Sequence, residues 1–184
     1  MMSQTGLSGV TLGKLAEHAS LSKSGLFAHF RSKEQLQTEL LNYTAEFVQT
    51  MVVDPAMQFP EGKPRLEALV RHWLGWTARV GLSGGCPVAA AVFELDDTES
   101  PIREKFLAKE KEWRGFLNQL VQEAIDKGHF RKDLDVKQFV WELCGIYLAH
   151  HVTFRFIRDP QANSYAEIAF QALIRRSLPV NKSG

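Results

Sequence analysis

The stretch LSKSGLFAHFRSKEQL, residues 21–36, contains the starts of two helices within sixteen residues. Ser22 is a suitable N-cap, and Leu21 before it can pack on Leu26 as a hydrophobic staple. A second serine, Ser32, opens an S-x-x-Q capping box. The stretch therefore predicts a short helix between the two serines, followed at once by a longer one.

A further short helix is expected immediately before this stretch. Leu12, Leu15, Ala16 and Ala19 recur at the spacing of one helix face, and Thr11 before them is a suitable N-cap. Two short helices joined by a tight turn are the layout of a helix-turn-helix, whose second helix enters the major groove of DNA. A plain helical hairpin with a solvated face has the same periodicity, so spacing alone leaves both readings open.

The remaining chain also repeats its apolar residues at a helical period, which predicts an all-α fold. Pro and Gly in FPEGKP, residues 59–64, indicate a linker. We expect a DNA-binding unit over residues 1–53 and a ligand-binding and dimerisation domain over residues 54–184. The helix that begins after Ser32 should end before Asp54-Pro55. Five further helices are expected, from Pro64 to the GLSGG of 81–85, from Pro87 to about Asp97, from Pro101 to Gly128, from Asp135 to Asp159-Pro160, and from about Tyr165 to Leu178.

Residue types on the second short helix suit a nucleic-acid interface. Small residues let the backbone approach base edges, a lysine can reach guanine or a phosphate, and hydroxyls can donate to phosphates. A glycine inside a helix costs about 1 kcal/mol relative to alanine, which indicates a reason for its presence, such as the close approach of another surface. The candidate DNA-binding residues are Thr11, Ser22, Lys23, Ser24, Gly25, Phe27, His29 and Lys33.

The segment VTLGKLAEHASLSKSGLFAHFRSKEQL, residues 10–36, resembles the DNA-binding unit of the TetR family of bacterial regulators. The resemblance implies a homodimer that binds a palindromic operator, acts as a repressor, and is released by a small organic effector bound in an all-helical C-terminal domain. It rests on Thr11, Leu15-Ala16, Ser22-Lys23, Phe27, His29-Phe30 and Ser32-Lys33-Glu34.

Two departures from the family pattern bear on DNA binding. The family usually has a tyrosine at the position of Phe27, so a hydroxyl contact to phosphate is lost here. Only MMSQTGLSG precedes Val10, so we expect the family's first helix to be missing and one wall of the helix-turn-helix core with it. The chain would then bind operator weakly, or be a ligand-binding and dimerisation module without DNA binding. A gel-shift comparison with a version extended upstream tests this expectation, and equal, tight binding by both versions would contradict it.

The second half of the chain is rich in bulky aromatic residues. They indicate a pocket for an apolar or aromatic small molecule, or else simply fill the core. Cys86 precedes a helix start, where the dipole can activate a thiol for sensing, although a small buried cysteine is the simpler reading. The candidate pocket residues are Trp73, Trp76, Cys86, Phe93, Trp113, Phe116, Trp141 and Tyr147.

The family resemblance also implies that the last two helices form a four-helix bundle with a second copy of the chain. A two-fold dimer suits a protein in which each recognition helix reads one half-site. The small and apolar faces expected there are Leu143, Tyr147 and Phe154 on one helix and Ile168, Ala169, Ala172 and Leu173 on the other.

Other classes of protein lack their signatures in this sequence. There is no Gly-rich phosphate loop and no Gly-x-Ser-x-Gly, so an enzyme is not expected. Neither a metal nor a cofactor is expected, because His150 and His151 point about 100° apart on a helix and the two cysteines are far apart. No apolar run long enough to span a membrane and no secretory signal is present, which predicts a cytoplasmic protein. The net charge of +1 leaves the partner undecided.

Overall fold

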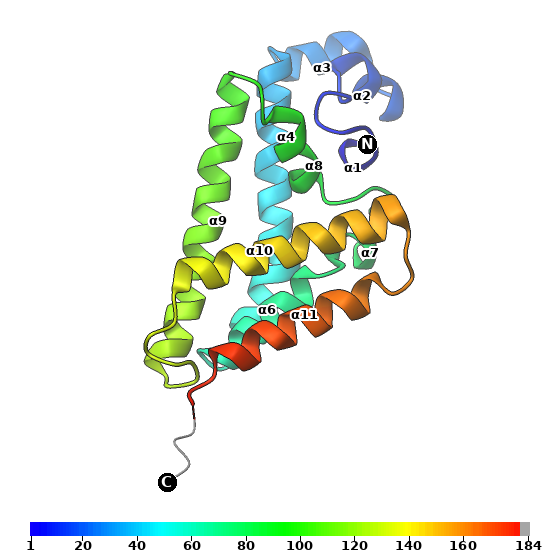
Figure 1. Cartoon of the computed structure of the whole chain (residues 1–184). Coiled ribbons are helices and arrows are strands. Elements are labelled where there is room, and N and C mark those ends of the chain that lie inside the picture. The colour runs from blue at the N-terminus through cyan, green and yellow to red at the C-terminus, as the bar shows by residue number, and fades with distance from the viewer. Residues whose placement is uncertain (181–184) are drawn as a thin grey trace. The chain divides into compact units, whose positions relative to one another are not determined.

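The computed structural model describes residues 1–180, and these residues form helices and connecting turns with no strand among them (Figure 1). The predicted all-α class is confirmed. The chain divides into two compact units. The N-terminal unit comprises Met1–Val48 and Thr77–Glu110, and the C-terminal unit comprises Gln49–Trp76 and the chain from Lys111 onward. This division differs from the expected boundary at residue 53, because the segment 77–110 packs with the N-terminal residues.

Two of the expected N-caps start the helices of the N-terminal unit. Thr11 Oγ1 accepts the Lys14 backbone N–H at 3.2 Å, and Ser22 Oγ accepts that of Gly25 at 3.1 Å. Ser20 between the two helices has φ of 55°, in the left-handed region, which makes the connection tight. The unit contains α1 (Met2–Thr5), α2 (Leu12–His18), α3 (Lys23–His29), α4 (Lys33–Val48), α8 (Pro87–Leu95) and the start of α9 (Pro101–Asp126).

Residues before α2 complete the apolar core of the N-terminal unit on the side where we expected contacts to be missing. A helical turn, α1, opens the chain, and Met2, Leu7 and Val10 are at most 7% exposed. They pack with residues of α2 and α3 and with Leu95 of α8 in one apolar cluster. The expectation that the first helix is missing is therefore not confirmed, since a short helix and the loop after it supply apolar contacts at this place.

The start of α4 shows the predicted capping chemistry. Ser32 Oγ accepts the backbone N–H of Gln35 at 3.0 Å, while Gln35 Oε1 accepts the N–H of Arg31 at 2.8 Å. The second bond goes to the residue before the cap, which differs slightly from the standard box. Leu21 remains 56% exposed, which does not support its predicted staple contact with Leu26.

The expected helix end before Asp54-Pro55 is wrong. After α4 the chain stays helical through a π-helical turn, η1 (Gln49–Val53), and then α5 (Asp54–Met57). Pro55 lies in the first turn of α5, where a helix needs no N–H from it. The wider π-helical turn precedes the proline, and the residue just before α5, Val53, keeps helical φ and ψ.

The C-terminal unit is built from long helices. Asp135 Oδ1 accepts the Gln138 N–H at 3.0 Å and so caps α10, as predicted. The stripe expected to run unbroken to residue 81 is interrupted at Gly75, whose φ of 69° ends the preceding helix. The helices are α6 (Lys63–Trp73), α7 (Trp76–Arg79, where the chain leaves this unit), the rest of α9, α10 (Val136–Val152), the π-helical turn η2 (Thr153–Ile157) and α11 (Ala162–Ser177).

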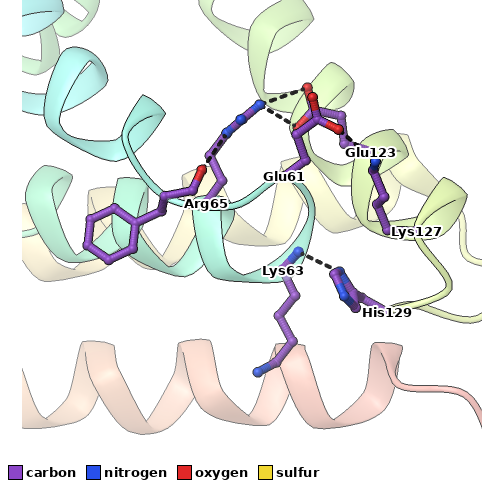
Figure 2. A network of polar contacts seen from close by, with 7 residues as sticks. Glu61, Lys63, Arg65, Glu123, Lys127 and His129 are labelled. Atoms are coloured by element: carbon purple, nitrogen blue, oxygen red, sulfur yellow. Dashed lines mark hydrogen bonds and ion pairs between the residues drawn. The ribbon is translucent and has the colours of Figure 1, made fainter.

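A network of ion pairs joins the start of α6 to the end of α9 (Figure 2). Arg65 Nη1 lies 3.2 Å from Glu123 Oε2, and Arg65 Nε donates to the Phe59 carbonyl at 3.3 Å. Lys127 Nζ lies 2.8 Å from Glu61 Oε2. The hydrogen bond and positive charge of Lys127 lower the pKa of Glu61 from its usual value. These contacts fix the linker before α6, which explains why FPEGKP is ordered.

A histidine from the turn after α9 caps α6. The first residue of α6 donates its backbone N–H to His129 Nδ1 at 3.2 Å (Figure 2), and no side chain of the preceding loop caps this helix. A Cβ atom on Gly62 would lie 2.4 Å from the same nitrogen, and its φ is 86°. Glycine is therefore required at position 62 both by the backbone conformation and by the close approach of the imidazole.

Candidate nucleic-acid interface

The residues predicted to face DNA on α3 are exposed around the helix, which buries Leu26. Lys23, Ser24, Phe27 and His29 are all exposed, whereas Leu26 is 7% exposed and packs into the core. The apolar side of the helix therefore fixes its orientation and leaves the lysine, the small residues and the aromatic ring on the outside. Ser22, Gly25 and Lys33 are exposed as well, and Thr11 is half-buried.

Gly25 has a reason within the chain in addition to the predicted approach of another surface. A Cβ atom on it would lie 3.0 Å from Ser22 Oγ, the atom that caps the helix. The Gly25 N–H is itself the donor in that cap. Glycine at this position therefore leaves room for the Ser22 side chain that caps the helix, a reason that the local sequence pattern does not indicate.

Charge around α2 and α3 favours a polyanion. Residues 11–33 contain four Lys or Arg and one acidic residue, although the whole chain is nearly neutral. Two of these cations, Lys14 and Arg31, were not among the predicted site residues, and both are exposed. A count of charges in this window finds them from the sequence. The local excess supplies the counterion-releasing groups that DNA binding needs.

Five of the predicted pocket residues gather in the C-terminal unit. Trp73 stacks on Tyr147 with ring centroids 4.2 Å apart, and Trp113 meets Trp73 edge-on at 5.1 Å. Trp76 Nε1 donates to the Tyr147 hydroxyl at 3.0 Å, and Phe116 lies beside Trp113. These rings are packed against one another, so they form an aromatic cluster that contains the buried hydrogen bond from Trp76 to Tyr147.

The other three predicted pocket residues lie elsewhere. Cys86 is buried at the start of α8, and Phe93 is 57% exposed on the same helix, so both belong to the N-terminal unit. Trp141 is 66% exposed on α10. The structure therefore does not bring all eight residues into one pocket, because aromatic content alone does not show which helices face each other.

A groove of about 570 Å³ runs between α10 and α11. Figure 1 shows these helices side by side in the C-terminal unit, and they contact each other along their length. Trp141 and Tyr165 stand at the groove with much of their surface exposed. The floor is lined by small residues, namely Gly145, Ala149, Ala162, Ala166, Ala169 and Ala172.

Comparison with known families places both parts of the chain. Residues 1–40 match the model described as bacterial regulatory proteins of the tetR family. Residues 62–170, more than half of the chain, match the model described as the tetracyclin repressor-like C-terminal domain. The chain belongs to the TetR family. The predicted helix-turn-helix is thereby confirmed, and the protein is a transcriptional regulator with an N-terminal DNA-binding domain.

Solved structures of TetR regulators share this fold. A TetR transcriptional regulator from Chloroflexus aurantiacus J-10-FL is 25% identical, with a TM-score of 0.81 over 95% of this chain and 86% of that one. AibR, solved with isovaleryl coenzyme A and operator DNA, is 21% identical, with a TM-score of 0.72 over 97% and 92%. The ketosteroid regulator KstR2 of Mycobacterium tuberculosis is 18% identical, with a TM-score of 0.70 over 97% and 90%. Among curated proteins, none matches the sequence.

The face that the last two helices of this TetR protein present differs from the expected one. Leu143, Tyr147 and Leu173 are at most 8% exposed and belong to the interior of the C-terminal unit. Ile168 is 61% exposed, and Ala169 lines the groove, as the expected face requires. The residues predicted for the dimer face of α10 lie on the buried side of that helix. Both sides of α10 are apolar, so periodicity does not show which side is buried in the same chain.

We expect His151, near the end of α10, to make the stability of this TetR protein depend on pH. Burial, then the positive charges of Arg155 and His150, lowers the pKa of its imidazole from the usual 6.5. Because the pKa is lower in the folded state, the unfolded state takes up the proton first as pH falls. The free energy of unfolding therefore keeps its full value above the unfolded pKa and decreases as pH falls toward the folded pKa. We expect urea unfolding to show a free energy that falls between pH 7.5 and 5. The profile of His151→Gln should be flatter, and parallel profiles would contradict this reading.

Two other kinds of site are absent from the described residues. In the part of the chain that the structure covers, no helix is long and apolar enough to cross a membrane. Within residues 1–180, no three His, Cys, Asp or Glu side chains come together in a way that could hold a metal ion.

Proposed function

We propose that this TetR-family protein is a repressor that binds a palindromic operator as a homodimer and is released by a small apolar or aromatic effector. The observation that carries the proposal is the exposed side of α3, where Lys23, Ser24, Gly25 and Phe27 stand out beside a local excess of positive charge. Residues 1–53 are the DNA-binding part in this account, and the protein acts in the cytoplasm.

The groove between α10 and α11 supports the dimer. Its small side chains let a second pair of helices approach closely, and the exposed Trp141, Tyr165 and Ile168 offer apolar area for burial. A two-fold interface is self-complementary, so one such face on each copy is sufficient. Two recognition helices then read two half-sites about one helical turn apart.

The aromatic cluster supports an apolar effector. Trp73 and Tyr147 are each less than 10% exposed, so a ligand entering there must displace rings and alter the hydrogen bond from Trp76. Two regulators of the same fold are AibR, solved with isovaleryl coenzyme A, and the ketosteroid regulator KstR2. Because ring packing changes on binding, we expect quenching of tryptophan fluorescence by an effector of this class. Trp73→Phe should remove most of that signal, and the matched Trp141→Phe should not.

A promoter-fragment titration tests the proposed function. Fluorescence anisotropy with labelled genomic promoter fragments should show tight binding that weakens steeply with salt. Isovaleryl coenzyme A and a ketosteroid serve as effector probes, and release of DNA by either supports the repressor. Ligand binding without affinity for any promoter fragment would instead support the alternative, a ligand-binding and dimerisation module that does not bind DNA.

Lys23→Ala tests the face of α3 directly. Loss of one charge-assisted contact to DNA should weaken operator binding about tenfold and reduce the slope of log K against log salt by about 1. Lys137→Ala is the matched control, because Lys137 is exposed on α10 in the C-terminal unit. The control should bind as the wild type does. Equal binding by wild type and Lys23→Ala would show that this face does not contact DNA.

A further inference from the structure

We propose that Glu94 of α8 is a positioning residue for DNA binding, which acts by anchoring the loop that leads into α2. The inference rests on the proposed function, because its readout is operator affinity. Glu94 was not among the residues predicted from the sequence, and it lies outside the helix-turn-helix in the chain.

The Glu94 carboxylate binds two consecutive backbone amides of the N-terminal loop. Oε1 accepts the N–H of Leu7 at 2.9 Å, and Oε2 accepts the N–H of Ser8 at 2.9 Å. Hydrogen bonds to an ionised acceptor are stronger than those between neutral groups. The pair of bonds also fixes the direction of the loop, because both oxygens of one rigid carboxylate are used.

The residue before these amides, Gly6, leaves space for the Glu94 carboxylate. Gly6 has φ of 71°, and a Cβ atom at this position would lie 1.9 Å from Glu94 Oε1. Glycine therefore allows both the backbone turn and the close approach of the carboxylate. Leu7, whose N–H is bound, has a fully buried side chain, so the loop is held by apolar packing on one side and by Glu94 on the other.

The start of α8 holds the same N-terminal segment at a second point. The N–H of Gly85, just before α8, donates to the Ser3 carbonyl at 3.1 Å. A Cβ atom on Gly84 would lie 1.6 Å from that carbonyl oxygen, so the two backbones are in close contact. Segments at both ends of α8 thus bind the residues that precede the helix-turn-helix.

The anchored loop sets the position of α2 because the two are separated by only a few residues. Val10 N–H donates to the Leu7 carbonyl at 3.3 Å, and Val10 is 1% exposed. Thr11, the N-cap of α2 and a predicted phosphate contact, follows at once. A loop released from Glu94 leaves the entry to α2 less restrained, and a smaller fraction of molecules then holds the binding-competent arrangement. Apparent affinity falls in proportion to that fraction.

If Glu94 positions the loop, removal of its carboxylate should weaken DNA binding, whereas if its charge acts directly on DNA, removal should not weaken it. A carboxylate near DNA repels the phosphates. Removal of a carboxylate that acts only through its charge therefore strengthens DNA binding or leaves it unchanged. Its removal as an anchor weakens binding. Glu99→Gln provides the matched charge control, because Glu99 is an exposed glutamate in the loop just after α8 within the N-terminal unit.

The experiment compares Glu94→Ala, Glu94→Gln and Glu99→Gln with the wild type in operator titrations at several salt concentrations. We expect Glu94→Ala to bind about tenfold more weakly, and Glu94→Gln, which keeps one acceptor oxygen, about threefold more weakly. Glu99→Gln should stay within about twofold of the wild type. The salt slope should be unchanged in every variant, because no phosphate contact is lost. Equal affinity for Glu94→Ala and wild type would overturn the proposal.

Amide hydrogen exchange on the full chain without DNA tests the anchor separately. In Glu94→Ala the amides of Leu7 and Ser8 should exchange about tenfold faster, while those of α4 and α10 keep the wild-type rate, which shows that both units remain folded. Unchanged exchange at both amides would overturn the anchor. If the wild type binds no promoter fragment while Glu94→Ala still speeds this exchange, the proposed function fails and the anchor stands.

Discussion

Replacing Ala169 with glutamate is expected to convert the proposed dimer into a monomer and to abolish tight operator binding. Ala169 lines the groove between α10 and α11 and is exposed in the single chain, so the substitution leaves each copy folded. In a two-fold interface the new carboxylate is buried twice without a partner, and each burial costs several kcal/mol. We expect the dimer dissociation constant to rise at least about a hundredfold, and operator affinity to fall by a similar factor.

Sedimentation velocity measures the first effect. The wild type should sediment with twice the chain mass of 20.8 kDa, and Ala169→Glu with that mass alone. Ser164→Glu is the matched control, because it adds the same charge to the first turn of α11 at an exposed position outside the groove lining. That control should remain dimeric. A dimeric Ala169→Glu would place the interface on another surface.

Replacing Phe130 with alanine is expected to lower the free energy of unfolding by about 3–5 kcal/mol. Phe130 is 1% exposed, and its ring lies 5.6 Å from that of Phe139 between centroids. Its N–H donates to the Ala124 carbonyl at 3.0 Å, and the next residue, Arg131, donates to the Ser177 carbonyl at 2.8 Å. The ring therefore fills the point where the turn after α9 meets α10 and the end of α11, and a cavity there loosens all three.

Urea unfolding followed by circular dichroism gives this value. Phe156→Ala removes the same side chain from a position that is 86% exposed, so its cost should lie within about 0.5 kcal/mol. Phe130→Leu leaves a smaller cavity and should fall between the two. A loss below about 1 kcal/mol for Phe130→Ala would show that the surrounding side chains collapse into the space.

Local signals in the sequence were sufficient to place the starts of several helices, whereas the choice of a helix-turn-helix over a plain helical hairpin needed the family resemblance. Thr11, Ser22 and Asp135 each cap a helix by accepting a hydrogen bond from the amide three residues further along the chain. Because both partners lie within one short stretch, the sequence pattern can indicate them. The exposed side of α3 was predictable for the same reason, because Leu26 identifies the buried side of a short helix. Such features depend on neighbours within one helical turn.

Features that depend on partners distant in the chain were not predictable. Glu94 binds amides 87 and 86 residues away, and nothing in the local pattern indicates those partners. Trp141 and Tyr147 lie on the same helix but have different surroundings, one at the groove and one in the aromatic cluster. Periodicity shows that α10 is apolar, but it does not show which side a second helix covers.

Selection of DNA duplexes from a random pool by the full chain tests whether this protein binds operator DNA as a dimer. Sequencing the bound fraction should reveal an inverted repeat with half-site centres about 10 base pairs apart, and mass measurement of the complex should show two chains per duplex. Lys23→Ala should bind the same repeat about tenfold more weakly, whereas Lys137→Ala should bind it as the wild type does. A pool that stays random after selection, or a single chain bound per site, would contradict the account of this protein as a dimeric operator-binding regulator.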